Sequence, residues 1–278
     1  MNINIDAASA MSIAQIALSS TQSDFLKIVE SMASGSSATI NPSDLFVSTD
    51  INVDTTSRYA AIENAQQGVN LTQIADGALA EVNNSLSKIM ELSTKAANDT
   101  YSDSQRSAMQ AEINQLTEQI SKSLASTNYN GKELLNVVST QNPQEIDKIG
   151  FQVGTGSDSN SIVSYDPNIK LDDLNFDVSS AESAKESMAK VEGMMESVST
   201  KRSEIAATQT SLVNSIEANM TAIINGQSSY SQITDTNYAS SMVDLLSNQL
   251  TQQSLLAVMS QTVKSQSSIM NLISGISA

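Results

Sequence analysis

The chain has 278 residues, with 30 acidic and 14 basic side chains, a net charge of −16, and neither Cys nor His. Nucleic acids and anionic membranes bind clustered Lys and Arg, so this charge argues against both as partners. The missing Cys and His exclude disulfides, thiolate metal sites and the commonest general base. The sequence therefore predicts no metal site, no cofactor and no enzyme.

The composition favours long helices. Only 3 Pro and 10 Gly are available to interrupt them, and 12 Met stand against 4 Phe, 6 Tyr and no Trp. Small and flexible side chains suit the narrow seams of helical rods. We predict a mainly α fold, a long antiparallel helical rod or coiled coil.

Membrane and signal segments are not expected. No stretch reaches the eighteen or so apolar residues of a membrane span. Residues 1–10 have no basic region and no cleavage site after an apolar stretch, which predicts a chain that is cytoplasmic or exported without a cleaved signal peptide.

The N-terminal segment, residues 1–42, carries apolar residues at alternating spacings of three and four, typical of a coiled-coil seam. Its seam positions are Met11, Ala14, Leu18, Thr21, Phe25, Ile28 and Met32.

The C-terminal segment, residues 236–278, shows the same spacing. Its predicted seam is Met242, Leu245, Leu256, Met259, Val263, Met270 and Ile273. Beyond Asp244 only Lys264 is charged, so we expect both helices to be covered by partners.

Between these ends, we predict that residues 43–235 form a helical rod. The sequence Asn-Pro-Ser-Asp and its surroundings favour an extended or irregular linker over residues 36–55, followed by a helix over residues 56–98. Ser104 is the expected N-cap of a second helix, and the Asn-Tyr-Asn-Gly sequence that follows this helix predicts a turn.

The centre of the chain changes period. Residues 149–166 alternate apolar and polar positions around a Gly-rich turn, which predicts the one small β-hairpin of the chain. A third long helix is expected from Ala181, with a break over residues 226–235 before the C-terminal seam.

Several motifs resemble bacterial flagellins. Residues 64–79 read NAQQGVNLTQIADGAL and are followed by EVNN, while NYNG at 128–131 and RSEI at 202–205 keep the family's order and spacing. The resemblance implies a structural subunit that self-assembles into the extracellular bacterial flagellar filament for motility. It also implies that the terminal segments pair as the inner core. The short centre indicates a compact form without large outer domains. The alternatives are a hook–filament junction protein and a secreted flagellin-like protein that acts on host cells.

The terminal seams are the first candidate site, an assembly interface that becomes buried in the filament. Its predicted residues are Met11, Leu18, Phe25, Ile28, Leu256, Met259, Val263 and Met270. The alternative is an ordinary core within one chain, and both interpretations hold in part, because terminal helices can pair within and between subunits.

A second candidate rests on the resemblance alone. It is a patch similar to the flagellin surface that an innate receptor recognises, formed by Ser87, Lys88, Glu91, Leu92 and Glu112. Lys88 replaces a customary Arg, which removes bidentate hydrogen bonding, so a solvated or inter-subunit face is the alternative.

The resemblance also implies the partners of this chain. They are other copies of the same subunit in a homo-polymer, a flagellar export chaperone and hook-associated proteins. The resemblance also suggests glycosylation of the 155–164 turn, which is otherwise an ordinary polar loop.

Overall fold

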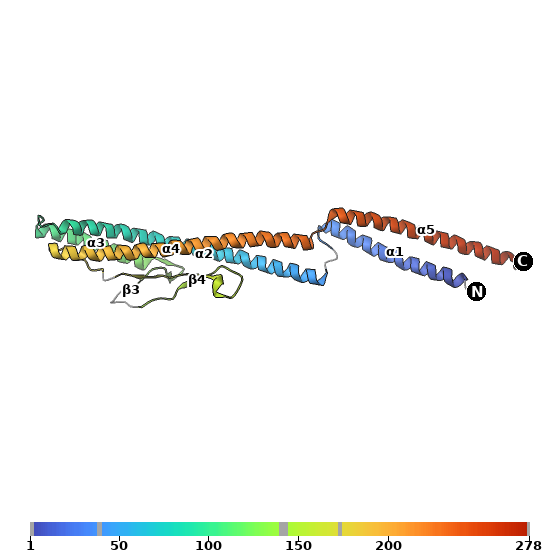
Figure 1. Ribbon diagram of the computed structural model, residues 1–278, viewed down its shortest axis with the longest axis horizontal. Helices are drawn as coiled ribbons and strands as arrows, with labels where there is room; N and C mark the ends of the chain where they lie inside the picture. The colour runs from blue at the N-terminus through green and yellow to red at the C-terminus, as the bar shows by residue number, and fades with distance from the viewer. Residues whose placement is uncertain (1–2, 38–40, 139–143, 172–173, 277–278) are drawn as a thin grey trace. The chain divides into compact units, whose positions relative to one another are not determined.

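The computed structural model describes residues 3–37, 41–138, 144–171 and 174–276. Five long helices dominate it, as predicted for a mainly α fold (Figure 1). The chain forms two compact units, the first made of Met1–Val53 and Asn225–Ala278 and the second of Asp54–Ile224. The boundaries between these units, at 53/54 and 224/225, fall inside long helices. The boundaries predicted from the sequence, at 42/43 and 235/236, were placed where helix breaks were expected.

The first unit is built on a pair of terminal helices, α1 (Ile3–Ser34) and α5 (Tyr238–Ile276). They lie side by side and run antiparallel, because the end of α1 contacts the start of α5 (Figure 1). The predicted pairing of the two ends of the chain is therefore present within one molecule.

Helix α2 (Pro42–Ala96) begins earlier than the sequence predicted, so an extended linker over residues 36–55 is wrong. Pro is well suited to the first position of a helix, since it has no N–H to leave unsatisfied there. The Asn41 carbonyl accepts a bond from the Leu45 N–H at 2.9 Å, and Ser48 and Thr49 donate back to the Leu45 carbonyl. The residues that resemble a turn are a helix start.

Helix α4 (Ala181–Thr234) begins as expected but continues through residues 226–234 of the predicted break at 226–235, and the chain leaves the helix only at 235–237, before α5. A single Gly weakens a helix without ending it. Ser229 and Thr234 donate their hydroxyls to carbonyls one turn earlier, Asn225 and Tyr230, which satisfies these polar side chains inside the helix.

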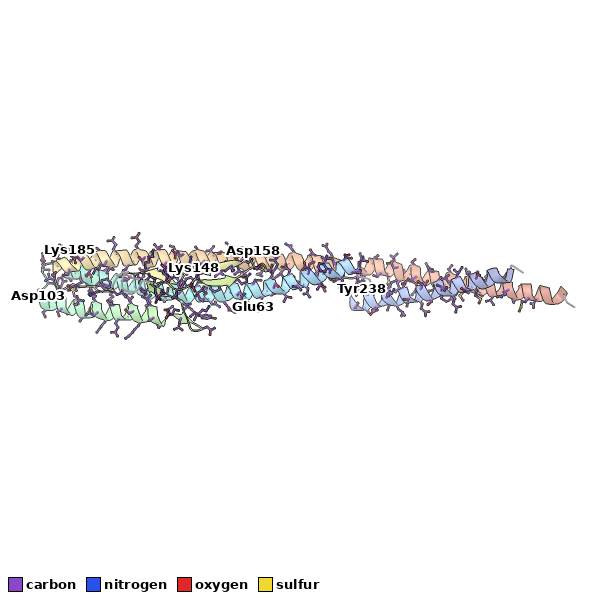
Figure 2. All side chains as sticks on the ribbon, turned by 90° about the horizontal axis from the view of Figure 1, so that it is seen from below. Glu63, Asp103, Lys148, Asp158, Lys185 and Tyr238 are labelled. Carbon is purple, nitrogen blue, oxygen red and sulfur yellow. The ribbon has the colours of Figure 1, made fainter. Side chains whose placement is uncertain are left out.

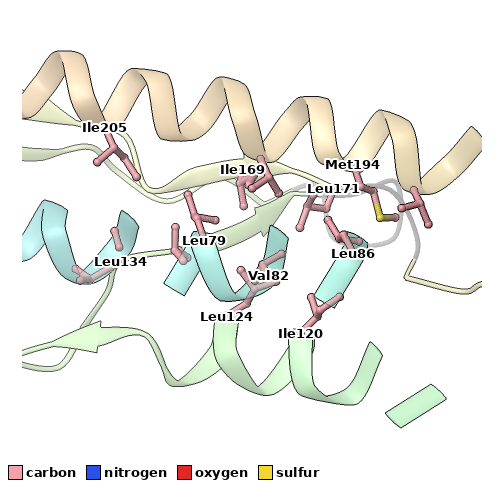
Figure 3. Packing of buried hydrophobic residues seen from close by; sticks show 14 of the residues in the cluster. Leu79, Val82, Leu86, Ile120, Leu124, Leu134, Ile169, Leu171, Met194 and Ile205 are labelled. Carbon is pink, nitrogen blue, oxygen red and sulfur yellow. The ribbon is translucent and has the colours of Figure 1, made fainter. Parts of the chain in front are cut away.

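The second unit buries one continuous core between helices. Figure 3 shows Leu79, Val82 and Leu86 of α2 facing Ile120 and Leu124 of α3 (Asp103–Ser126). Met194 and Ile205 of α4 close the same core from the other side. Helix α3 starts two residues earlier than expected, because its N-cap is Ser102, which forms a capping box with Gln105, and not Ser104.

Three small two-stranded sheets lie beside these helices in the described part of the chain. The predicted hairpin is β4 (Ile149–Gln152) paired antiparallel with β5 (Ile162–Tyr165), joined through the short 3-10 helix η1 (Ser159–Ser161). A second hairpin joins β1 (Asn128–Tyr129) to β2 (Lys132–Glu133). Its turn uses Asn130 and Gly131 at positive φ, 50° and 77°.

The third sheet could not be read from the sequence, because its two strands are distant and parallel. Strand β3 (Asn136–Val138) pairs with β6 (Asn168–Lys170). The buried Tyr165 hydroxyl, at the end of β5, donates to the Leu134 carbonyl between β2 and β3 at 2.5 Å and so joins two of the small sheets. Burial raises the pKa of Tyr165 far above its usual value, so the hydroxyl stays a donor.

Two polar residues that interrupt the heptads of α4, Arg202 and Asn219, have partners across the second unit. Arg202 binds Asp76 of α2 through two bonds of 2.8 and 3.2 Å. Asn219 is buried, accepts from Arg58 at 3.1 Å and donates to the Val153 carbonyl at 2.8 Å. These bonds run from late α2 to early α4 and from early α2 to late α4, so the two helices are antiparallel.

Two glycines of α2 give opposite expectations for the same substitution. A Cβ at Gly68 would lie 3.0 Å from Leu212 Cδ1 and 3.1 Å from Phe151 Cγ, whereas a Cβ at Gly77 meets nothing within 4 Å. Gly77→Ala should raise the free energy of unfolding by about 0.5–1 kcal/mol through helix propensity. Gly68→Ala should lower it by about 1 kcal/mol through overpacking. Thermal unfolding followed by far-UV circular dichroism measures both, and equal shifts would contradict the close approach at Gly68.

Candidate assembly surface

The α1 side of the terminal pair follows the predicted seam. Residues that are buried or half-buried recur at spacings of three and four along the helix, while most residues between them are exposed. These seam residues are Met11, Ala14, Leu18, Thr21, Phe25, Ile28 and Met32. The heptad pattern of α1 therefore located its inward face correctly.

The α5 side differs from the prediction. Its half-buried residues are Ser241, Leu245, Asn248, Gln252, Leu255, Met259, Thr262 and Gln266. Five of these eight are polar. The Oδ1 atom of Asn248 is buried without a hydrogen-bond partner among the described residues. The inward face of α5 is thus less apolar than its sequence suggests.

The predicted seam of α5 combined two neighbouring columns of residues. Leu245 and Met259 face inward, but a column that we call the flanking column lies outside. It is spaced by seven and consists of Met242, Gln249, Leu256, Val263 and Met270. Its four apolar members are 46–64% exposed. Because this column is more apolar than the true seam, the apolar pattern selected it. The side chain of Ile273 lies outside the described residues.

The eight residues predicted for the assembly interface therefore divide into two groups. Five of them pack in the α1–α5 seam: Met11, Leu18, Phe25, Ile28 and Met259. The other three, Leu256, Val263 and Met270, are exposed on the flank of α5. One group can hold the pair together and the other is available to another molecule.

The exposed apolar surface of α5 extends beyond the flanking column. Sequence reasoning missed four further large apolar side chains with exposures of 54–67%: Val243, Leu246, Leu250 and Val258. Helix α1 adds Ile13, Ile16, Leu26 and Val29 at 39–69%. One column of α5 stays polar throughout, at Ser247, Ser254, Gln261 and Ser268. Apolar surface is thus concentrated on part of the helix.

The patch predicted from resemblance is only partly assembled. Lys88 of α2 and Glu112 of α3 line one groove between these helices, and Ser87 and Glu91 are exposed nearby. The hydrogen bond from Lys95, 2.6 Å long, holds the pKa of Glu91 below its usual value. Leu92 belongs to the buried core, so its membership of an exposed patch is wrong. It faces inward because it continues the heptad of α2.

Metal-ligand clusters and membrane-spanning helices were both sought in the described part of the chain. No three His, Cys, Asp or Glu side chains there are grouped as metal ligands would be. None of the helices in the described ranges combines the length and the apolarity needed to cross a bilayer.

A chain whose two ends pair into one helical unit with apolar side chains outside is built as a subunit of a larger assembly. The comparisons with known proteins agree with this class. The bacterial flagellin N-terminal helical region matches residues 3–140. A flagellar filament 30.7 kDa core protein of Treponema maltophilum is 28% identical over 260 residues, which cover 88% of this chain and 91% of that protein.

Flagellin FlaB1 of Treponema pallidum is 27% identical over 275 residues, 94% of this chain and 96% of that protein. The crystal structure of Bacillus cereus flagellin aligns with a TM-score of 0.48 and 20% identity over 56% of this chain and 88% of that one. The chain belongs to the bacterial flagellin family, and it is a structural subunit of the flagellar filament.

The seam can be tested separately from the outer face. Phe25→Ala removes a half-buried ring from the α1–α5 seam and should weaken the pair by about 2 kcal/mol. Ile16→Ala, at a position 69% exposed, should change the stability of the pair little. Hydrogen exchange of the α1 and α5 amides measures the difference. Equal protection in both variants would show that Phe25 does not hold the pair.

Proposed function

We propose that copies of this flagellin assemble through the exposed apolar face of α5, in which the flanking column is the part next to the seam. The supporting observation is that three predicted interface residues, Leu256, Val263 and Met270, are exposed although the α1–α5 pair is formed. Contiguous exposed apolar surface on a protein marks an interaction site. In this proposal the seam residues hold α5 against α1, and the flanking column of α5 contacts a neighbouring copy.

The area available is consistent with assembly by many weak contacts. Burying the exposed half of an aliphatic side chain stabilises by about 1 kcal/mol. The eight exposed large apolar residues of α5 would together contribute on the order of 8 kcal/mol. Association itself costs roughly 4–15 kcal/mol in lost freedom. One contact between two copies would then be marginal, whereas a subunit that touches several neighbours in a filament would be held firmly.

The cellular setting follows from the family. We propose that the chain is exported without a cleaved signal peptide and polymerises outside the cell; the support is its similarity to proteins named as flagellar filament core proteins. A flagellar export chaperone for the C-terminal helix and hook-associated proteins at the filament ends stay predictions from the family resemblance.

The flanking column predicts which single charges stop polymerisation. Leu256→Asp and Val263→Asp should leave the α1–α5 pair intact but lower the rate of filament elongation at least tenfold. The physical reason is that the interface would bury an unpaired carboxylate. The measurement is elongation from filament seeds, followed by electron microscopy and light scattering.

Gln261→Asp is the matched control, because it adds the same charge to the polar column of the same helix, one turn before Lys264. It should elongate at the rate of the unchanged chain. Equal elongation by Leu256→Asp and Gln261→Asp would reject the flanking column as an assembly surface. A hook–filament junction protein, in contrast, would stop growth at the seed in every variant.

A further inference from the structure

The turn between β1 and β2 places a chemically labile sequence on the surface of the second unit. Asn130 is followed by Gly131, and all the residues of this hairpin, 128–133, are exposed. Asn is one of the thermolabile residues of proteins. The backbone nitrogen of the next residue can attack its side-chain carbonyl carbon, and a following Gly has no side chain to hinder the attack. Asn130 is therefore a candidate for spontaneous modification.

The two groups that would react are both unoccupied. The hairpin ladder pairs Tyr129 with Lys132 and leaves the Gly131 N–H outside it. Among the described residues neither this N–H nor the Asn130 side chain has a hydrogen-bond partner. Asn128, in the same hairpin, differs, because its side-chain amide donates to the Ser126 carbonyl at 3.0 Å. The nucleophile and the carbon that it attacks are thus free only at Asn130.

The backbone of Asn130 is held in a conformation that it would readily leave. In the described part of the chain it is the one residue other than Gly with positive φ, at 50°. This left-handed conformation is unfavourable for L residues. Strands β1 and β2 have two residues each, and isolated two-stranded hairpins are marginally stable in water. Opening of the tip lets the Gly131 nitrogen approach the Asn130 side chain.

The base of the hairpin is fixed, so this opening is local. The Leu134 N–H donates to the Thr127 carbonyl at 3.0 Å, and the Leu134 and Leu135 side chains are buried. Figure 2 labels Asp103 at the start of α3, and the hairpin follows the opposite end of this helix. The tip can therefore move while the chain on both sides of it stays anchored.

The other Asn-Gly and Asp-Gly sequences of the chain lie inside helices. They are Asn225–Gly226 in α4 and Asp76–Gly77 in α2. Within a helix each backbone N–H bonds a carbonyl one turn earlier, so the nitrogen is not available for attack. The Asp76 carboxylate is also held by two hydrogen bonds from Arg202. The turn leaves its Asn-Gly sequence without such protection.

We propose that Asn130 is a site of spontaneous deamidation. The Gly131 nitrogen loses its proton and forms a bond to Asn130 Cγ. The bond from Cγ to the side-chain nitrogen breaks, and ammonia leaves a cyclic imide behind. Water then opens the imide at either carbonyl and gives aspartate or isoaspartate. The sum is asparagine and water converted to an acid and ammonia, with no oxidant, reductant or enzyme.

The products change the turn in two ways. Both add one negative charge to a chain whose net charge is already −16. Isoaspartate also lengthens the main chain by one carbon, which disturbs the pairing of Tyr129 with Lys132. Because the reaction needs no enzyme, the modified fraction rises with the age of the subunit. The site is separate from α5, so the proposal does not depend on the proposed assembly surface.

The test follows both Asn residues of the hairpin in one peptide. The full chain is incubated in mildly alkaline buffer at physiological temperature, and a sample digested before incubation sets the starting level. Trypsin cleaves after Lys122 and Lys132, which releases residues 123–132. Tandem mass spectrometry locates the conversion of amide to acid, and an isoaspartyl methyltransferase labels isoaspartate. Asn130 should convert steadily, whereas Asn128, bonded and followed by Tyr129, should stay an amide.

Ser215→Gly provides the matched control, because it creates an Asn-Gly sequence at 214–215 within α4 of the same compact unit. Asn214 is exposed, as Asn130 is. Protease cleavage after Glu204 and Glu217 isolates this site, and far-UV circular dichroism checks that the helices remain. In the folded variant Asn130 should react at least ten times faster than Asn214, whose neighbouring nitrogen is bonded in the helix. In concentrated urea the two sites should react at similar rates.

Three results would overturn the proposal. One is an Asn130 that stays an amide in the folded chain although it reacts in urea. The others are an Asn128 that converts as fast as Asn130, and an Asn214 that does so in the folded variant. None of these measurements requires filaments, so a failure here is distinguishable from a failure of the flanking column to drive assembly.

Discussion

The pairing of α1 with α5 through a single narrow seam is the constraint on which the function of this chain depends. Two helices can bury only one stripe of each other, and on α5 that stripe holds five polar residues out of eight. The larger apolar side chains of α5 remain outside. The two helices are fully paired, but much of their apolar surface stays exposed. That imbalance is what makes the terminal unit a component of a polymer and distinguishes it from an ordinary hairpin of helices.

The second unit solves the same packing problem differently. Helices α2, α3 and α4 share one core, and the small sheets add Phe151, Tyr165 and Ile169 to it. Two polar residues in its heptads are satisfied across the unit, Arg202 by Asp76 and Asn219 by Arg58. With three helices and a covering layer, each seam has a partner inside the chain. This unit therefore holds most of the buried core, while the terminal unit keeps most of the exposed apolar side chains.

Signals that mark helix ends in the sequence depended on context. Pro42 and its neighbours indicated a turn but form the first turn of α2, because Pro is equally suited to both. Gly226 indicated a break, yet α4 continues through it with hydroxyl groups bonded back into the helix. The 149–166 hairpin was predictable because its pairing is local, whereas β3 and β6 pair over a long separation that no local pattern reveals.

The sequence by itself determined the mainly α class, the heptad stripe of α1, the nearly uncharged ends and the flagellin motifs, because each is written in residue type and local spacing. Only the tertiary structure decided which column of α5 faces inward. Columns one residue apart share the same seven-residue period, so a single helix carries no record of which one its partner covers. The same reason leaves Leu256, Val263 and Met270 outside. The fold thus separates the residues that hold one subunit together from those offered to the next.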